Sequence, residues 1–250
     1  MRIACLRWLF LLLSVVGTAR AFDHDHAAFT RVLSGAVTNG LVDYAGLHRA
    51  PAELDAYLDV LAAVTEPEFD AWSPSERQAF LINLYNAATL RLILDHHPVR
   101  GIRRIGGWFG SPWKIGCVRL WGRKVSLDHV EHGLLRPRFR EPRVHFALVC
   151  AAKGCPPLRE EAYSASRLDA QLDDQARRFL AQPEKNRFDE AAGTVWLSPI
   201  FQWYGSDFAV GGATVPAVLG PWLGESQRRL VQRTDVVVRY TDYDWSLNGR

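Results

Sequence analysis

One apolar segment, residues 73–94, constrains the fold of this chain more than any other feature. It opens with Ser-Pro-Ser-Glu at 73–76. The first serine can cap a helix, the proline fits the first helical position, and the glutamate can complete a capping box. Apolar residues then occupy most faces up to Leu94. A helix of this kind is buried, so the sequence predicts one long helix inside a hydrophobic core.

Two asparagines lie inside this predicted helix, at positions 83 and 86. Residues three apart share one side of a helix, and buried amides must find hydrogen-bond partners. Asn83 and Asn86 can therefore tie down the neighbouring backbone. Alternatively, one of them orients a catalytic group or donates to an oxyanion.

Shorter elements surround this segment in the predicted fold. Hydrophobic spacing and caps predict further helices at 25–33, 51–61, 126–135, 166–180 and 198–204, a hairpin at 118–125, and strands at 195–197 and 236–240. The chain shows no internal repeat or linker. We therefore predict a single α+β domain at 22–250, in which buried helices pack on a small, mostly antiparallel sheet.

The amino terminus has the pattern of a secretory signal peptide. Basic residues precede an apolar stretch at 8–16, and Ala19-Arg20-Ala21 forms an Ala-x-Ala cleavage site. We expect cleavage after Ala21 and a periplasmic or secreted protein. No later stretch approaches the roughly 20 apolar residues that cross a bilayer, so no stable membrane insertion is expected after cleavage.

Charge argues against a nucleic-acid partner. The formal net charge is only +3, and the arginines are spread along the chain.

The stretch 143–158 holds the best candidates for chemistry, His145, Cys150 and Cys155. The apolar run 144–149 predicts a buried strand that carries His145. Pro156 can begin a helix, which would place Cys155 at its N-cap, where the helix dipole lowers a thiol pKa.

The cysteine count leaves three alternatives open. Loss of Cys5 with the signal peptide leaves Cys117, Cys150 and Cys155 in an oxidising compartment. Cys150 and Cys155 can form a disulfide, one of them can be a reactive thiol, or all three can be inert and buried.

A thiol enzyme also needs a base and a group that orients it. His145 and Glu131 supply these types, although each also has a plain structural explanation, as a core histidine and a helix-face acid. On a continuous strand His145 and Cys150 would point apart. Either Cys150 already lies in the turn or Cys155 curls back towards His145.

Metal and cofactor signals are weak. His129 and His132 have a spacing that metals use on a helix, but no third ligand is placed beside them. We predict neither a metal nor a cofactor.

Five ordered blocks resemble the DUF547 family, bacterial and plant domains named as being of unknown function. The blocks are 79–87, 126–132, 143–158, 198–204 with Asp207-Phe208, and 243–248. The resemblance implies a looser kinship with papain-like or transglutaminase-like thiol folds. It also implies that the position of Cys155 need not be cysteine in the plant relatives.

Two functions from different classes follow. The first is an exported thiol-dependent hydrolase or acyl-transfer enzyme that acts on an amide of a peptide, a γ-glutamyl compound or cell-wall material. The second is a non-catalytic ligand- or protein-binding domain with a Cys150–Cys155 disulfide, in which aromatic residues line the binding surface. The candidate aromatic residues are Trp108, Trp113, Trp203 and Tyr204. A metal-dependent hydrolase built on His129, His132 and His145 ranks third.

Overall fold

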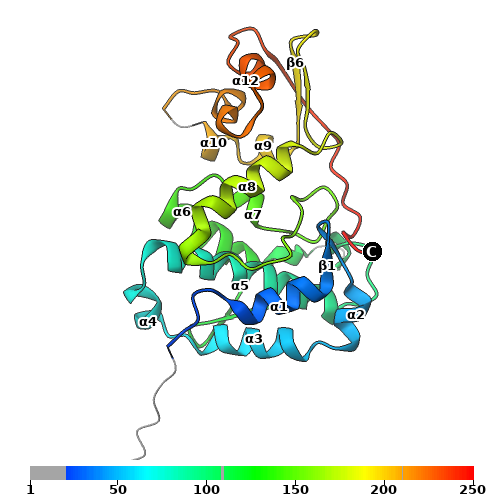
Figure 1. The fold of residues 1–250 in the computed structure, drawn as a ribbon. Helices are drawn as coiled ribbons and strands as arrows, with labels where there is room; N and C mark the ends of the chain where they lie inside the picture. The colour runs from blue at the N-terminus through cyan, green and yellow to red at the C-terminus, as the bar shows by residue number, and fades with distance from the viewer. Residues whose placement is uncertain (1–20, 108–109, 210) are drawn as a thin grey trace, which may run out of the picture.

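The computed structural model describes residues 21–107, 110–209 and 211–250. Most of the predicted signal peptide, and Trp108, therefore lie outside the described residues. Within them the protein is an α+β structure with many helices and three small sheets (Figure 1), which confirms the predicted fold class.

The long helix α5 (Pro74–Asp95) lies at the centre of the larger hydrophobic core, as predicted. Both hydrogen bonds of the capping box are present. The Ser73 hydroxyl accepts from the Glu76 amide, and the Glu76 carboxylate accepts from the Ser73 amide at 2.7 Å. The middle of the helix is buried on nearly every side because α2, α3 and η3 pack around it.

The other elements of the described chain are short. The longer helices are α1 (Ala27–Ala36), α2 (Tyr44–Arg49), α3 (Ala52–Ala63), α4 (Glu66–Ala71), α8 (Leu168–Leu180) and α12 (Glu225–Val231). The single-turn helices are α6 (Arg136–Phe139), α7 (Val144–Ala147), α9 (Ile200–Trp203), α10 (Gly205–Phe208) and α11 (Val215–Val218). The 3₁₀ turns are η1 (Ile102–Arg104), η2 (Pro112–Lys114), η4 (Ala165–Arg167) and η5 (Gly220–Trp222), and η3 (His129–Leu135) is a π-helix.

The strands form three separate sheets. Two are hairpins, β1 (Val37–Thr38) with β2 (Leu41–Val42) and β3 (Val118–Leu120) with β4 (Arg123–Val125). The third has the order β5-β6-β7, from β5 (Arg187–Asp189), β6 (Thr194–Leu197) and β7 (Val237–Tyr240). Strands β6 and β7 are parallel, whereas the other pairs are antiparallel. The predicted single sheet under the helices is therefore divided, and the buried helices pack mainly on one another.

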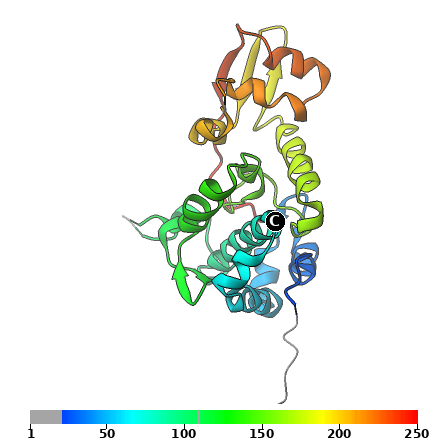
Figure 2. The same cartoon turned by 90° about the vertical axis from the view of Figure 1, so that its left-hand side faces the viewer.

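A second, smaller hydrophobic cluster lies beyond α8. It joins the end of α8 to β6, α9, α10 and α12, and Phe146 of α7 belongs to it. Figure 2 shows α8 running from the larger helical part towards this smaller part. The sheet and helices of the smaller part come from residues after 180.

The carboxyl-terminal residues 241–250 return from the smaller part to the helical part (Figure 1). Their backbone pairs with four distant segments, at Leu197, at Arg100, at Val42 and at 151–154. The Tyr44 hydroxyl of α2 donates to Asn248 Oδ1 at 2.7 Å. We call this segment, residues 241–250, the C-terminal strap.

The predicted strand at 144–149 is wrong. Residues Val144–Ala147 form one helical turn, closed by the hydrogen bond from Leu148 N–H to the Val144 carbonyl at 3.0 Å. This turn lies between the two hydrophobic clusters and is buried on all sides. A short apolar run does not distinguish a buried strand from a buried helical turn.

The predicted helix after Cys155 is also absent, since residues 156–161 form no regular element. The Lys185 ammonium donates to the Cys155 carbonyl at 2.6 Å, and the Gln175 amide donates to the Pro157 carbonyl at 2.6 Å. These side chains hold the segment extended. Cys155 therefore has no helix dipole beside it.

In the described part of the chain, no helix combines the length and apolar character that crossing a membrane requires.

Candidate functional site

A cavity of about 260 Å³ lies between α5, η3, α9 and the C-terminal strap. Its ionisable and sulfur-bearing lining residues are Asp128, Glu131, His132, His145, Cys150 and Cys155. Its aromatic lining residues are Tyr85, Trp113, Trp203, Tyr204, Tyr243 and Trp245. Four of the six predicted site residues therefore share one cavity, together with three of the predicted aromatic residues.

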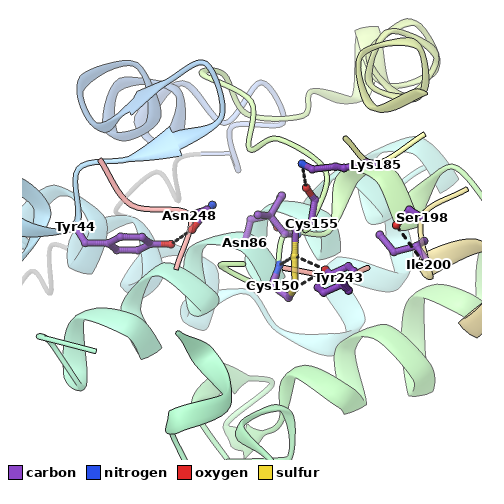
Figure 3. Close-up of a disulfide and its surroundings, with 10 residues drawn as sticks. Tyr44, Asn86, Cys150, Cys155, Lys185, Ser198, Ile200, Tyr243 and Asn248 are labelled. Carbon is purple, nitrogen blue, oxygen red and sulfur yellow. Dashed lines mark hydrogen bonds between the residues drawn. A yellow bond between two sulfur atoms is a disulfide. The ribbon is translucent and has the colours of Figure 1, made fainter. Parts of the chain in front are cut away.

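Cys150 and Cys155 are joined by a disulfide, with their Cα atoms 6.3 Å apart. The Tyr243 hydroxyl lies 3.1 Å from Cys155 Sγ and 3.3 Å from Cys150 Sγ (Figure 3). The Cys150 amide donates to Cys155 Sγ at 3.0 Å. Of the three alternatives left open by the sequence, the structure contains the disulfide.

Cys117 is the one free cysteine in the described chain, and it is half-buried. Burial raises the pKa of its thiol to about 11. It is therefore a poor nucleophile at neutral pH.

His145 pairs with Asp207, a residue outside the predicted site. The imidazole is almost fully buried, with 1% of its side chain exposed, and its Nε2 lies 2.8 Å from Asp207 Oδ2. Arg136 holds the same carboxylate through Nε at 2.6 Å and Nη2 at 2.8 Å. These guanidinium hydrogen bonds hold the pKa of Asp207 at about 2. Asp207 is thus an ionised carboxylate.

The contact with Asp207 assigns the histidine tautomer. An ionised carboxylate only accepts hydrogen bonds, so Nε2 of His145 carries the proton and donates it. Burial lowers the pKa of His145 to about 4, against the opposing effect of Asp207. The imidazole is therefore neutral at pH 7, and Nδ1 is the nitrogen that can accept a proton.

Glu131 lies on the other side of the same imidazole. Its Oε1 is 3.7 Å from His145 Nδ1, which is longer than a hydrogen bond. Burial raises the pKa of Glu131, against the opposing effects of His132, Tyr204 and Arg136. The Tyr204 ring stacks on the imidazole at a centroid distance of 3.9 Å. His145 is therefore held between an aromatic ring and two carboxyl groups.

The local helix geometry places Glu131 and His132 at the cavity. The sequence predicts an ordinary helix at 126–135, capped by Ser126, and the Ser126 hydroxyl does accept from the His129 amide at 3.1 Å. From His129 the helix has the wider π geometry. Such π turns are rare and are frequent at functional sites.

Asn83 and Asn86 bind backbone groups with both ends of their amides. Asn83 donates to the Tyr163 carbonyl at 2.7 Å and accepts from the Tyr163 amide at 3.0 Å. Asn86 donates to the Ala147 carbonyl and accepts from the Val149 amide, both at 2.9 Å. Asn86 thus fixes the backbone that leads from His145 to Cys150, and Figure 3 shows its side chain beside the disulfide.

Within the described residues, no group of three or more His, Cys, Asp and Glu side chains is arranged to hold a metal ion. His132 lines the cavity, and its Nδ1 lies 3.1 Å from Arg136 Nη1.

Asp207, Arg136 and Tyr243 are the site residues that the sequence did not single out. Asp207 and Tyr243 do lie in blocks that resemble the family. The resemblance therefore marked their positions, but it did not indicate what either side chain does. Their contacts join residues 62 to 93 positions apart, and hydrophobic periodicity carries no information on such distances.

Residues 69–180 match the family model described as "Protein of unknown function, DUF547". The DUF547 family predicted from the sequence is therefore confirmed over residues 69–180, which contain three of the five blocks. The matched residues include α5, η3, His145 and both cysteines of the disulfide, whereas Asp207 and Tyr243 lie beyond them. No curated protein and no solved structure is significantly similar to the chain.

Proposed function

We propose that this protein is an exported, thiol-dependent hydrolase or acyl-transfer enzyme that acts on an amide bond. One observation carries the proposal: a single cavity is lined by two cysteine sulfurs and by an imidazole that an ionised carboxylate orients. Nucleophile, base and orienting acid are the three parts of a thiol site. A peptide, a γ-glutamyl compound or cell-wall material would supply the amide.

Cys150 is the nucleophile in this proposal. Its side chain is half-buried at the cavity, whereas Cys155 is only 3% exposed. Cys155 Sγ also accepts hydrogen bonds from the Cys150 amide and the Tyr243 hydroxyl. Cys155 therefore serves as the partner thiol, consistent with a position that need not be cysteine in every relative.

The active form is the reduced protein. Reduction by an external dithiol adds two electrons and two protons to Cys150 and Cys155 and oxidises the dithiol to a disulfide. No hydrogen bond joins His145 to either sulfur among the described residues. The freed Cys150 side chain must therefore turn towards His145 Nδ1 before it can react.

The reaction then follows from the tautomer of His145. Nδ1 accepts the thiol proton, and the thiolate attacks the amide carbonyl carbon. The imidazolium returns the proton to the nitrogen as the C–N bond breaks, which leaves a thioester on Cys150. Water or a second amine attacks the thioester and restores the thiol. Asp207 stabilises the transient imidazolium throughout.

A covalent acyl-enzyme tests this proposal. Reduced protein is mixed with an activated ester such as p-nitrophenyl acetate, and the acylated peptide is identified by mass spectrometry. We expect acetyl on Cys150 in the wild type and in Cys155→Ser, and none on Cys150 in His145→Gln. Equal acylation of Cys150 and Cys117 in the wild type would contradict the proposal.

The disulfide favours a second candidate, a binding domain without catalysis. In that case the disulfide braces the cavity wall permanently, and the aromatic residues bind a ligand or a protein partner. Reduction would then lower stability and expose no reactive thiol. The acylation experiment separates the two candidates, because only the enzyme forms a thioester.

Export is a separate part of the proposal. The apolar stretch and the Ala-x-Ala site would direct the chain to the periplasm or the medium. The mature protein should begin at Phe22, which amino-terminal sequencing of the natural protein checks. Its substrate is a small molecule or a peptide, and we expect no nucleic-acid partner.

A further inference from the structure

We propose that the substrate of this cavity carries a protonated amine or a quaternary ammonium group, which binds against an aromatic wall formed by Trp203, Tyr243 and Trp245. This inference rests on the proposed function only because it takes the same cavity as the substrate site.

The three rings form one continuous surface. The Tyr243 ring lies 4.4 Å from Trp245 and 4.9 Å from Trp203, centroid to centroid. Trp203 and Trp245 are 5.8 Å apart and nearly parallel, with an interplanar angle of 24°. Trp203 remains 48% exposed. An exposed indole beside a cavity is an accessible surface for a ligand, and the face of an aromatic ring attracts cations.

One cation already uses this wall. The Arg103 guanidinium lies over the Trp245 ring, 5.0 Å from its centroid. The contact comes from a different part of the chain, the 3₁₀ turn η1. The Arg103 contact shows that a ring face of this wall can take a positive charge. Among the described residues, no cation lies over the Trp203 ring.

The charges of the cavity have the matching sign. Its lining includes the carboxyl groups of Asp128 and Glu131 and, within the described chain, no lysine or arginine. Arg136 lies nearby, but its guanidinium is paired with Asp207 through two hydrogen bonds. An ammonium group in the cavity would therefore meet carboxyl oxygens, chiefly those of Asp128, because burial raises the pKa of Glu131. A carboxylate or phosphate ligand would meet the same carboxyl groups and be disfavoured.

The buried imidazole adds no competing charge. Burial lowers the pKa of His145 to about 4, so His145 is neutral at pH 7. In an acyl-transfer reaction a bound primary ammonium passes one proton to His145 Nδ1, attacks the thioester as the free amine and gives a second proton to the leaving thiolate. A quaternary ammonium has no N–H and would be a cationic group elsewhere on the substrate, as either group would be in hydrolysis.

Choline and its neutral isostere 3,3-dimethylbutan-1-ol test the inference, because they have the same shape and differ in charge. Binding to the oxidised full-length protein is followed by calorimetry and by tryptophan fluorescence. We expect saturable binding of choline and at least about tenfold weaker binding of the isostere. Equal affinity for the two compounds, or no saturable binding of choline, would overturn the inference.

Two variants locate the site. Trp203→Leu and Asp128→Asn should each weaken choline binding, by about tenfold for the tryptophan. Trp196→Leu is the matched control, because Trp196 lies on β6 and does not line the cavity, so this variant should bind choline as the wild type does. Unchanged choline binding in Trp203→Leu would also overturn the inference.

The outcome is independent of the thiol chemistry. Failure of choline to bind, with acylation of Cys150 intact, would remove the inference and leave the proposed function standing. Choline binding without acylation of Cys150 would remove the proposed thiol chemistry and leave the inference standing.

Discussion

His145 lies between two effects that move its pKa in opposite directions. Burial lowers the pKa, and the carboxylate of Asp207 raises it. Burial is the larger effect, so the group is neutral in the native state and protonates only in strong acid. A neutral imidazole with one nitrogen fixed by a carboxylate is the form that a general base requires.

Acid should therefore destabilise the protein in a defined pH window. The pKa of His145 falls from 6.5 to about 4 on folding, so the unfolded chain binds a proton that the native state rejects. Stability is complete above pH 6.5 and is lost as the pH falls towards 4, by up to about 3 kcal/mol. Urea unfolding between pH 7 and pH 4.5 measures this slope.

His26 provides a matched comparison for that slope. It is also buried, its Nδ1 lies 2.7 Å from the Tyr57 hydroxyl, and its pKa is lowered to about 4. His26→Gln and His145→Gln should each flatten the pH dependence by a similar amount. A slope that neither variant changes would show that these histidines are not buried in the neutral form. Asp207, with a pKa of about 2, contributes only below this window.

Gly154 is required by the close approach of Tyr243. A Cβ at position 154 would lie 2.8 Å from Tyr243 Cδ1. Gly154→Ala should displace the ring that contacts both sulfurs and cost about 1–3 kcal/mol. Gly35→Ala is the control, because no atom lies within 4 Å of its Cβ position and it lies inside α1. That change should be neutral or stabilising, by up to about 1 kcal/mol. Equal thermal stability of the two variants would contradict the packing described here.

The sequence predicts correctly the helices and strands whose caps, turn residues or hydrophobic pattern lie within the segment itself. Helix α5 has its capping box and apolar faces, and α8 has a clear amphipathic pattern, so both were predicted close to their actual ends. The hairpin β3–β4 turns at Trp121 and Gly122, both with positive φ. In each case the information lies within the segment itself.

The predictions for two segments on either side of the disulfide are wrong. Residues 144–149 and 156–161 take their conformation from distant partners such as Asn86, Gln175 and Lys185. Local propensity does not contain those contacts. The same reason explains the candidate site: residue types predicted His145 and the cysteines, whereas Asp207 depended on the position of α10.

The two asparagines of α5 make the same kind of contact at different places. Each amide satisfies a backbone carbonyl and a backbone N–H that are otherwise buried. Asn83→Ala and Asn86→Ala should therefore each lower the free energy of unfolding by about 2–4 kcal/mol, measured with urea.

The two variants should differ in their chemistry. Asn86 holds the chain between His145 and Cys150, so Asn86→Ala should also reduce acylation of Cys150 under conditions where the protein remains folded. Asn83→Ala should leave acylation unchanged. Loss of acylation in both variants would indicate a general loss of structure.

At the scale of the whole molecule, the C-terminal strap connects the smaller part with the helical part. Its Tyr243 hydroxyl contacts the disulfide, its backbone pairs with that of residues 151–154, and its end lies beside α2. The active-site candidate is therefore assembled from residues far apart in the chain, from Tyr85 to Trp245.

The hydrogen bond between Tyr44 and Asn248 anchors the end of the C-terminal strap, and its contribution to the free energy of unfolding can be measured. Both side chains are buried, and their contact joins residues 204 positions apart. Tyr44→Phe and Asn248→Ala should each destabilise the protein by about 1–3 kcal/mol, and a double-mutant cycle should give a coupling of about 1 kcal/mol. Strictly additive effects in urea unfolding would show that the strap is not anchored there.

The central claim is that reduction releases an activated thiol at Cys150 beside His145. It is tested most directly by the pH dependence of iodoacetamide labelling in the reduced full-length protein, followed at each cysteine by mass spectrometry. We expect Cys150 to react faster than Cys117, with a labelling midpoint below the roughly pH 8.5 of a free thiol, and we expect His145→Gln to remove this advantage without unfolding the protein. Labelling of Cys150 no faster than that of Cys117, or unchanged in His145→Gln, would contradict it.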